Sequence, residues 1–470
     1  MIDPVKFEID ITSDRIPNRT VQLDPAVSDI DIYENIDFPF LTAKILITDE
    51  MNFLERFDII GGERVEMRLL NTKGQKDGGP ETKEIVKKFY VSQVLHSNRG
   101  EDNRTQTIGL HLIEDIGFES NLQNLNVVYK GKSSDIITKI VSNYLGKELD
   151  TEAKDIQTLK AIVPNLSPLD ACTWFANRAT TTEGYPFFFY STLVDKNLQF
   201  NDLGTLLERA VLNPTDDKGD APTFKYSKSA SMSEDHIIAY NTIYDYKLRN
   251  TENLYSLINQ GLIGSKQQFV NSSAVAETAN TNFNFNVSED LLTAFKFNAL
   301  PKKQNNLLFS DLFKFNGKSF NELKSRTITQ FGGSNSHRTT KSSNYDRSYS
   351  EDISKAHYKN TTKSQALLEY MFKAPLTFSL AGNEFARGLH NNTIGRRIRL
   401  QFLPTDPLAQ PDNLNDSKLS GEYLITGARH VIKRERYDIT FSGARFSNME
   451  IPEVNTRQAP IYDFEKGGPG

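Results

Sequence analysis

The segment Gly184-Tyr-Pro-Phe-Phe-Phe-Tyr-Ser191 places five aromatic side chains within six residues of a chain that is otherwise fairly polar. Such a run can be a membrane contact, a surface on which nucleic-acid bases stack, or a buried strand. It is too short to span a bilayer, which takes about 20 apolar residues in a helix. Base stacking needs a basic surround, and the neighbours Glu183 and Asp195 are acidic. The segment therefore predicts a core strand covered on both faces, between a helix and a barrel.

The residues on either side of this segment predict a helix followed by a β-hairpin. Ser167 is a suitable N-cap, and Pro168 suits the first helical position. After the aromatic run, the turn-like residues 194–197 lead into the alternating stretch 198–203, which completes the hairpin. An earlier helix is expected from Ser133 to Leu145, where apolar residues recur at helical spacing before Gly146.

Composition restricts the class of protein. The chain has 470 residues, of which 38% are hydrophobic, and a net charge of -5, so no global basic field favours nucleic acid. The single cysteine, Cys172, excludes an internal disulfide and a multi-cysteine zinc cluster. No signal peptide and no membrane-spanning window are visible, which predicts a soluble, intracellularly synthesised chain of several domains. Its 30 Phe and 18 Tyr against 6 Met favour strands.

Two distant segments share one pattern of Gly, strand, polar loop, strand with Tyr near its start and His near its end, charged turn, and strand. The first copy comprises Gly62–Leu70, Phe89–His96 and Thr107–Leu112, and the second comprises Gly395–Leu403, Glu422–His430 and Asp438–Phe441. The distance from Gly62 to Tyr90 is 28 positions, and so is the distance from Gly395 to Tyr423. The match predicts a structural duplication, which would let three chains close a ring of six similar units.

These patterns predict an α+β fold that is predominantly β, with two similar small antiparallel β-barrel domains, an intervening helix-plus-hairpin domain and a polar insertion. The expected domains are 1–125 (first barrel), 126–225 (helix and hairpin), 226–266 with 374–448 (second barrel), 267–373 (polar insertion ending in a helix) and 449–470 (C-terminal tail). Residues 332–363 are poor in apolar side chains and are expected to form an exposed insertion or flexible loop.

A search for reactive or ligand-binding motifs predicts no catalytic residue, no cofactor site and no metal site. Gly131-Lys132-Ser133 resembles the end of a phosphate-binding loop, but Asn126 stands where that loop needs Gly, and capping of a helix by Ser133 is the better interpretation. No two of the seven histidines have metal-binding helical spacing, and His96 and His430 are expected to be partly buried, hydrogen-bonded residues at equivalent strand ends. Cys172 is expected in the core of its helix.

Two basic clusters, Arg396-Arg397-Arg399 and Lys433-Arg434-Arg436, are the strongest electrostatic features. Arg397 and Arg399 share one face of a strand, opposite Ile398 and Leu400. Because exposed aromatics are sparse there, we expect a solvated or subunit-contacting face instead of a nucleic-acid site.

The helix-hairpin segment resembles the central region of baseplate hub proteins of contractile-tailed bacteriophages, to which the spike-base proteins of type VI secretion systems are related. The residues that carry the resemblance are Ser167-Pro-Leu-Asp-Ala-Cys-Thr-Trp-Phe-Ala-Asn-Arg-Ala179 and Leu198-Gln-Phe-Asn-Asp202, with Asn35–Asp49 and Gly61–Glu63 in the first barrel and Leu376–Gly382, Ile394–Gly395 and Gly421–His430 in the second. The resemblance covers most of residues 1–448. The long polar insertion and the tail after residue 448 depart from the family pattern.

The resemblance implies a structural, non-enzymatic late protein that is made in the host cytoplasm and located in the tail baseplate of the virion. Hubs of this family are homotrimers whose duplicated barrels form a pseudo-sixfold ring between the sixfold tail tube and the threefold central spike. The implied partners are the spike protein, the tail tube or a tube-initiator protein, baseplate wedge proteins and the tape measure protein. Genomic DNA would pass through the channel during ejection without specific binding, so few Lys or Arg should point inward.

Two alternatives remain open on the sequence. One is a spike-base protein of a contractile secretion system. The other is a tail-associated enzyme that cleaves the cell wall, because the two carboxylates of a glycosidase can lie far apart in sequence.

Overall fold

The computed structural model describes most of the N-terminal half of the chain and the strands that follow it. The described residues are 6–212 apart from 17–19, 51–55, 71–83, 100–104, 153–154, 156–157 and 210; then 224–227, 241–249, 375–382, 394–403, 416, 419–434 and 436–445; and the short segments 265–270, 283–286, 314–319, 326–331, 364, 367–368, 462–463 and 468–469.

The N-terminal sheet half is built of seven strands. They are β1 (Lys6–Thr12), β2 (Thr20–Gln22), β3 (Val27–Asn35), β4 (Thr42–Asp49), β5 (Arg64–Leu70), β6 (Ile85–Arg99) and β7 (Gln106–Glu114). Buried residues alternate with more exposed ones along β4 and β5, where burial switches at each residue. All pairs within this half are antiparallel, in the order β3-β4-β7-β6-β5-β1-β2.

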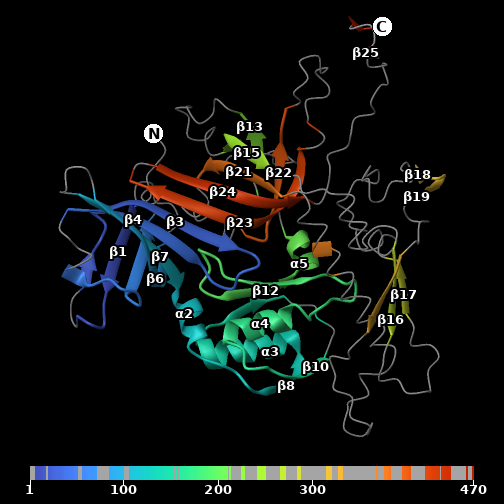
Figure 1. The fold of residues 1–470 in the computed structure, drawn as a ribbon, viewed down its shortest axis with the longest axis horizontal. Helices are drawn as coiled ribbons and strands as arrows, with labels where there is room; N and C mark the ends of the chain where they lie inside the picture. The colour runs from blue at the N-terminus through green and yellow to red at the C-terminus, as the bar shows by residue number, and fades with distance from the viewer. Residues whose placement is uncertain are drawn as a thin grey trace, which may run out of the picture.

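The helix-hairpin unit follows directly, from residue 115 to 208, and lies below the sheet in Figure 1. Its elements are α2 (Asp115–Asn121), β8 (Val128–Lys132), α3 (Ser133–Ile140), the π-helical turn η2 (Val141–Leu145), β9 (Leu149–Thr151), β10 (Thr158–Ile162), α4 (Pro168–Ala176), β11 (Phe187–Tyr190), β12 (Leu198–Asp202) and α5 (Leu203–Glu208). Two of the predicted caps are confirmed: the Ser167 side chain accepts from the Asp170 amide, and Gly146 ends η2 with a φ of 59°.

The C-terminal sheet half contains β13 (Phe224–Tyr226), β14 (Thr242–Ile243), β15 (Asp245–Leu248), β21 (Leu376–Ala381), β22 (Arg397–Gln401), β23 (Gly421–Lys433) and β24 (Arg436–Arg445). Strand β23 also pairs with β3, so the two halves form one 14-stranded sheet. One cluster of buried apolar side chains runs through both halves. The fold is therefore α+β and predominantly β, as the sequence predicts.

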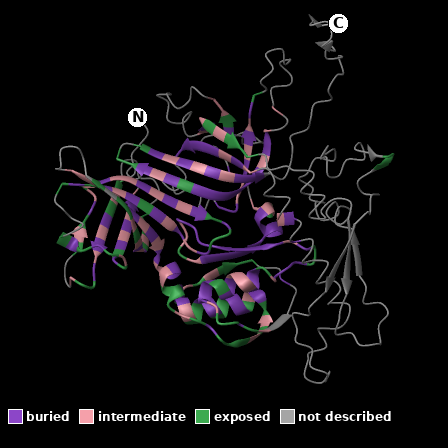
Figure 2. Ribbon diagram, viewed as in Figure 1, coloured by how far each residue is buried: buried purple, intermediate pink, exposed green. Residues whose placement is uncertain are grey.

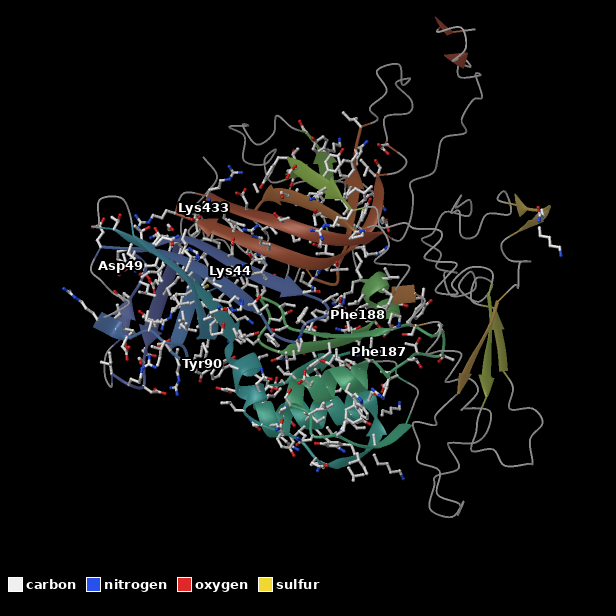
Figure 3. All side chains as sticks on the ribbon, viewed as in Figure 1. Lys44, Asp49, Tyr90, Phe187, Phe188 and Lys433 are labelled. Atoms are coloured by element: carbon white, nitrogen blue, oxygen red, sulfur yellow. The ribbon has the colours of Figure 1, made fainter. Side chains whose placement is uncertain are left out.

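The aromatic segment Gly184–Ser191 contains a strand, β11, that is covered on both faces, as predicted. All four residues of β11 are buried, and the strand pairs with β12 (Figure 2). Phe187 and Phe189 pack with the helices, whereas Phe188 and Tyr190 pack in the core of the sheet. Figure 3 places Phe187 and Phe188 between the helices and the C-terminal strands. Strand β11 therefore belongs to both hydrophobic cores.

The remaining described strands lie in or near the predicted polar insertion and the tail. They are β16 (Ser265–Val270), β17 (Phe283–Asn286), β18 (Lys314–Phe315), β19 (Lys318–Ser319), β20 (Arg326–Phe331), β25 (Tyr462–Asp463) and β26 (Gly468–Pro469). Strand β16 pairs with β17 and β20 in a separate three-stranded sheet. The predicted loop 332–363 lies outside the described residues, as does most of the helix predicted around 363–372, of which Ser364, Leu367 and Leu368 are helical.

Candidate functional site: the junction between the two sheet halves

The two sheet halves meet in an antiparallel ladder between β3 and β23. Seven residue pairs form it, from Gly427 opposite Asn35 to Lys433 opposite Asp29. Although nearly 400 positions separate the strands in sequence, the junction is continuous with the rest of the sheet. Each half therefore covers one open strand edge of the other.

A buried polar cluster fixes this ladder on its inner face. The carboxylate of Glu34 on β3 lies 2.5 Å from Nε2 of His430 on β23 and also accepts from the Leu193 amide at 2.7 Å. The second ring nitrogen of His430 lies 2.8 Å from the hydroxyl of Tyr437 on β24. Glu34, His430 and Tyr437 are 4%, 2% and 0% exposed. The cluster thus links both sheet halves and the loop of the β11–β12 hairpin.

Ion pairs on the outer face of the junction supplement the ladder. Arg429 pairs with Asp31 at 2.8 Å, and Lys433 pairs with Asp29 at 3.1 Å. The hydrogen bond to Asp31 raises the pKa of the Arg429 guanidinium. Because these cations are about half exposed, each pair stabilises the fold little, on the order of 0–1 kcal/mol.

A second buried carboxylate, Glu114 at the end of β7, ties the N-terminal half to the hairpin. It accepts from the Leu41 amide at 2.8 Å and the Ser191 hydroxyl at 3.1 Å, and Lys87 lies 3.4 Å away. The Lys87 ammonium also donates to the carbonyls of Thr192 and Asp195. The interactions of the Lys87 and Glu114 side chains account for their burial.

The internal repeat is visible in matched backbone hydrogen bonds. The Gly62 amide donates to the Val91 carbonyl at 2.7 Å, and the Gly395 amide donates to the Ile425 carbonyl at 2.9 Å. The reciprocal bonds, Val91 to Glu63 and Ile425 to Arg396, are both 2.9 Å. Gly62 and Gly395 both have positive φ, 87° and 77°.

In each half a β-bulge follows, and the hydroxyl of the bulge residue donates a hydrogen bond to a backbone carbonyl of the neighbouring strand. The register of β6 on β7 shifts between Val91 and Gln93, and that of β23 on β24 shifts between Ile425 and Gly427. The extra residues are Ser92 and Thr426, whose hydroxyls donate to the carbonyls of His111 and Ser442, each at 3.1 Å. The two halves are thus built to one plan, down to the bulge.

These bonds correct the alignment that the sequence suggests. Since Val91 corresponds to Ile425, Tyr423 corresponds to Phe89, and both are buried. Tyr90 points to the other face, where its ring stacks on Phe118 at 4.5 Å. The predicted match of Tyr90 with Tyr423 is wrong by one residue, because Val91 lies 29 positions after Gly62 whereas the equivalent Ile425 lies 30 positions after Gly395.

The two histidines at the strand ends are likewise not equivalent. His430 has the buried, hydrogen-bonded environment expected of it, whereas His96 is exposed. In the strand registers, His96 on β6 corresponds to Arg429, because Gly109 and Thr440 are the residues opposite them and are themselves equivalent.

Another histidine, His111 on β7, faces the bulge. Its Nδ1 lies 2.6 Å from the Ser92 hydroxyl. Burial, and then the charge of Lys44, lower the pKa of the imidazole below its ordinary value.

The basic clusters are paired within the chain. Arg397 and Arg399 lie on one face of β22, as predicted, and both contact Glu422, at 3.2 and 2.5 Å. Arg436 pairs with Asp438 at 2.5 Å. Arg397, Arg399 and Arg436 therefore have carboxylate partners within the chain.

Ser133 and Cys172 both lie in helices and are buried inside the fold. Ser133 is the first residue of α3, and its hydroxyl donates to the Phe175 carbonyl, so the predicted capping role is wrong: Lys132 is the N-cap, and no side chain caps the helix there. Cys172 is fully buried in the helical core, as predicted, and burial raises the pKa of its thiol.

Within the described ranges, no three His, Cys, Asp or Glu side chains cluster as metal ligands would. None of the helices in this part of the chain is both long and apolar enough to cross a membrane.

Comparison with solved structures finds similar chains among tail and secretion proteins. The tail protein from Neisseria meningitidis MC58 aligns over 93% of this chain and 96% of its own, with 11% identity and a TM-score of 0.47. The 43 kDa tail protein of prophage MuSo2 from Shewanella oneidensis aligns over 94% and 98%, with 11% identity and a TM-score of 0.48.

The E. coli c3393 protein, a component of the type VI secretion system, aligns over 90% of this chain and 74% of its own, with 10% identity and a TM-score of 0.38. No protein-family model matches the sequence. No curated protein sequence matches it either. At these identities and TM-scores, the function of the chain has to be argued from its own residues.

Proposed function

We propose that the chain is a structural baseplate hub subunit of a contractile phage tail. Three copies would form a pseudo-sixfold ring that joins the sixfold tail tube to the threefold central spike and surrounds the genome-ejection channel. The observation that carries the proposal is the duplication: two sheet halves with matched bulges and glycine turns, set side by side in one sheet. A trimer of chains with two like units each presents six like units. Such a ring can contact a sixfold tube on one side and a threefold spike on the other.

The residues of the junction suit a structural role. Glu34, Glu114 and His430 are buried and make their bonds to other parts of the fold. Buried, satisfied polar clusters of this kind specify one arrangement of strands. The proposal therefore assigns the chain no chemistry of its own, and we expect no enzymatic activity, no cofactor and no metal.

The proposed partners are a central spike protein, the tail tube or a tube initiator, baseplate wedge proteins and the tape measure protein. DNA would pass the ring without specific binding, so the wall of the channel should carry few unpaired Lys or Arg side chains, because phosphate binding would slow its transit. Rings of cationic side chains on that wall would contradict this part of the proposal.

The decisive experiment is a three-dimensional map of assembled tails together with the solution mass of the purified chain. A threefold ring of this chain between tube and spike supports the proposal, and a place at the base of a secretion-system spike would support the alternative instead. A peptidoglycan-clearing assay tests for the third function, because clearing by the purified chain would show a cell-wall-cleaving enzyme. A trimeric mass without clearing is the expected result.

A further inference from the structure

The matched halves also indicate which strand edges join one copy of the chain to the next. Within each half, four antiparallel strands follow one order, β3-β4-β7-β6 in the first and β15-β21-β24-β23 in the second. Through the equivalent bulges, β6 corresponds to β23, β7 to β24, β4 to β21 and β3 to β15. The β3–β23 junction thus joins the first strand of one half to the last strand of the other.

In the N-terminal half, β6 is the last of these four strands, and part of its outer edge is open. The part of β23 that pairs with β3 is 427–433, and the register on β7 and β24 makes 93–99 the part of β6 that corresponds to 427–432, with Leu95 as an extra residue at a bulge. Strand β5 pairs with β6 only as far as Tyr90. Among the described strands none pairs with β6 along this edge beyond that point.

In the C-terminal half, β15 is the first of the four matched strands, and its outer edge is also open. It pairs with β21 on one side, and the part of the chain that the structure describes has no strand on its other side. In β3, the corresponding edge carries the β23 ladder. In Figure 1 the strands β6 and β15 lie on opposite sides of the β3–β23 junction.

We propose that β15 of one copy pairs antiparallel with the outer edge of β6 in a neighbouring copy, and so repeats between chains the junction that β3 and β23 form within one. The inference deepens the proposed function, on which it rests, by naming the contact that would close the ring. A contact between two different strands, one from each chain, is a head-to-tail contact. Such contacts close into a ring when the rotation from one chain to the next divides a full turn evenly.

The register follows from the internal junction. In the internal junction, Val431 on β23 lies opposite Asp31 on β3. The residue of β6 equivalent to Val431 is Asn98, and the residue of β15 equivalent to Asp31 is Lys247, so Asn98 of one chain should lie opposite Lys247 of the next. Asn98 and Lys247 are both exposed in the single chain. One position along, Ser97 would lie opposite Leu248, which is 36% exposed.

The lengths of the two edges agree. Strand β6 has a second bulge, between Val94 and His96, which would interrupt a ladder there. Beyond it the strand continues from His96 to Arg99, and β15 is four residues long. A second copy of the chain therefore supplies a strand of the length that this edge accommodates, and pairing removes two open edges at once.

Engineered disulfides test the pairing. In a Cys172→Ser background, the variant with Asn98→Cys and Lys247→Cys should form covalent oligomers on mild oxidation, because residues directly opposite in antiparallel strands have Cα atoms about 4.5–5.5 Å apart, within the range of a disulfide. The matched control is Asn98→Cys with Asp245→Cys, two positions away, whose expected diagonal separation of about 7–8 Å is too long.

A positive control uses the internal junction. Asp31→Cys with Val431→Cys places thiols at the equivalent pair within one chain, so oxidation should close a bond inside the monomer and form no covalent oligomers. A second measurement, hydrogen exchange of the unmodified full chain, should show protection of the outward amides of residues 96–99 and 245–248 on assembly.

Each outcome separates this inference from the proposed function. Cross-linked trimers support both. A trimer by light scattering without cross-links or protection overturns the strand contact and leaves the hub role standing. Cross-linked rings of another number support the contact and overturn the trimeric hub. A chain that stays monomeric at its highest soluble concentration, with no cross-link and no protection, overturns both.

Discussion

The carboxylate of Glu34 and the imidazole of His430 lie 2.5 Å apart, although 396 positions separate the two residues in sequence. Their contact crosses the boundary between the two sheet halves, and both side chains are almost fully buried. The position of the C-terminal half on the N-terminal half therefore depends on one polar cluster as well as on the strand ladder.

Removal of the Glu34 side chain should destabilise the fold strongly. Glu34→Ala removes the carboxylate that the His430 ring and the Leu193 amide contact, and each buried polar group left unsatisfied costs about 1–3 kcal/mol. The free energy of unfolding from urea titration measures the loss. The matched control, Asp31→Ala, removes a partly exposed ion pair on the same strand and should cost about 0–1 kcal/mol. Equal losses in both variants would contradict the central role of Glu34.

The two equivalent glycines should differ in their tolerance of alanine. Both have positive φ, so either substitution costs on the order of 1–3 kcal/mol in backbone strain. A Cβ at Gly395 would also meet the Tyr190 hydroxyl at 2.9 Å and a methyl group of Leu206 at 3.1 Å, whereas a Cβ at Gly62 meets nothing within 4 Å. Gly395→Ala should therefore be less stable than Gly62→Ala by roughly a further 1–3 kcal/mol in thermal or urea unfolding. The opposite order would contradict the close packing of Tyr190 and Leu206 against Gly395.

Truncation of β11 should weaken both cores. Phe187→Ala opens a cavity among the helices and Phe188→Ala opens one in the sheet, each at a cost of about 3–5 kcal/mol. The only tryptophan, Trp174, packs against the helical core and reports on it by fluorescence, while far-UV circular dichroism reports on the secondary structure of the whole chain, including the sheet.

In both variants, the unfolding midpoints of both signals should move to a lower denaturant concentration, because one strand contributes side chains to both cores. Leu122→Ala, at a side chain that is 74% exposed, is the control and should change stability by less than about 0.5 kcal/mol. A variant that shifts only one signal would show that the helix-hairpin unit unfolds independently of the sheet.

The thiol of Cys172 should be unreactive in the folded chain. It is fully buried and its pKa is raised by burial, so the reactive thiolate is scarce and reagents have no access. A thiol-specific reagent should label one group per chain in denaturant and almost none in native buffer. Stoichiometric labelling of the native chain would contradict the packing of α4.

The pH dependence of stability should include a contribution from His111. Burial and Lys44 lower its folded pKa, so the unfolded chain binds the proton more readily. Stability from this group is therefore present above the ordinary histidine pKa of about 6.5 and is lost as the pH falls toward the lower folded value. Urea titrations between about pH 5 and pH 7.5 should show a smaller decline for His111→Gln than for the natural chain. Lys44→Met should reduce the decline only in part, because burial is the larger cause. If the free energy of unfolding declined with falling pH as steeply in His111→Gln as in the natural chain, this contribution would be excluded.

The sequence predicts the fold class, the helix at Ser167 and the buried aromatic strand, because caps and alternating patterns are local signals. It does not reveal that β3 and β23 pair, since pairing across almost 400 positions leaves no local trace. Strand β3 itself could have been found: Ile30 and Ile32 alternate with Asp29 and Asp31, which is the pattern of a half-buried strand. Glu34 lies on the same strand, two residues after Ile32 and on the same face.

The repeat shows a second limit of the sequence. Equal spacing of Tyr90 and Tyr423 suggests an alignment that hydrogen bonds correct by one residue. Residue identity is a weaker guide there than backbone geometry, because the connections between equivalent strands differ in length by one residue while the hydrogen bonds that define the sheet are the same.

The three phenylalanines of β11 are chemically interchangeable, so hydrophobicity alone does not decide which of them faces the helices and which faces the sheet. A slip of one residue would exchange the two sets. Tyr190 removes this ambiguity, since its hydroxyl lies within 3.5 Å of the Arg209 guanidinium and would lose that neighbour after a slip. A single oxygen atom at the end of the aromatic run thus marks the register of a strand that is otherwise symmetric in its chemistry.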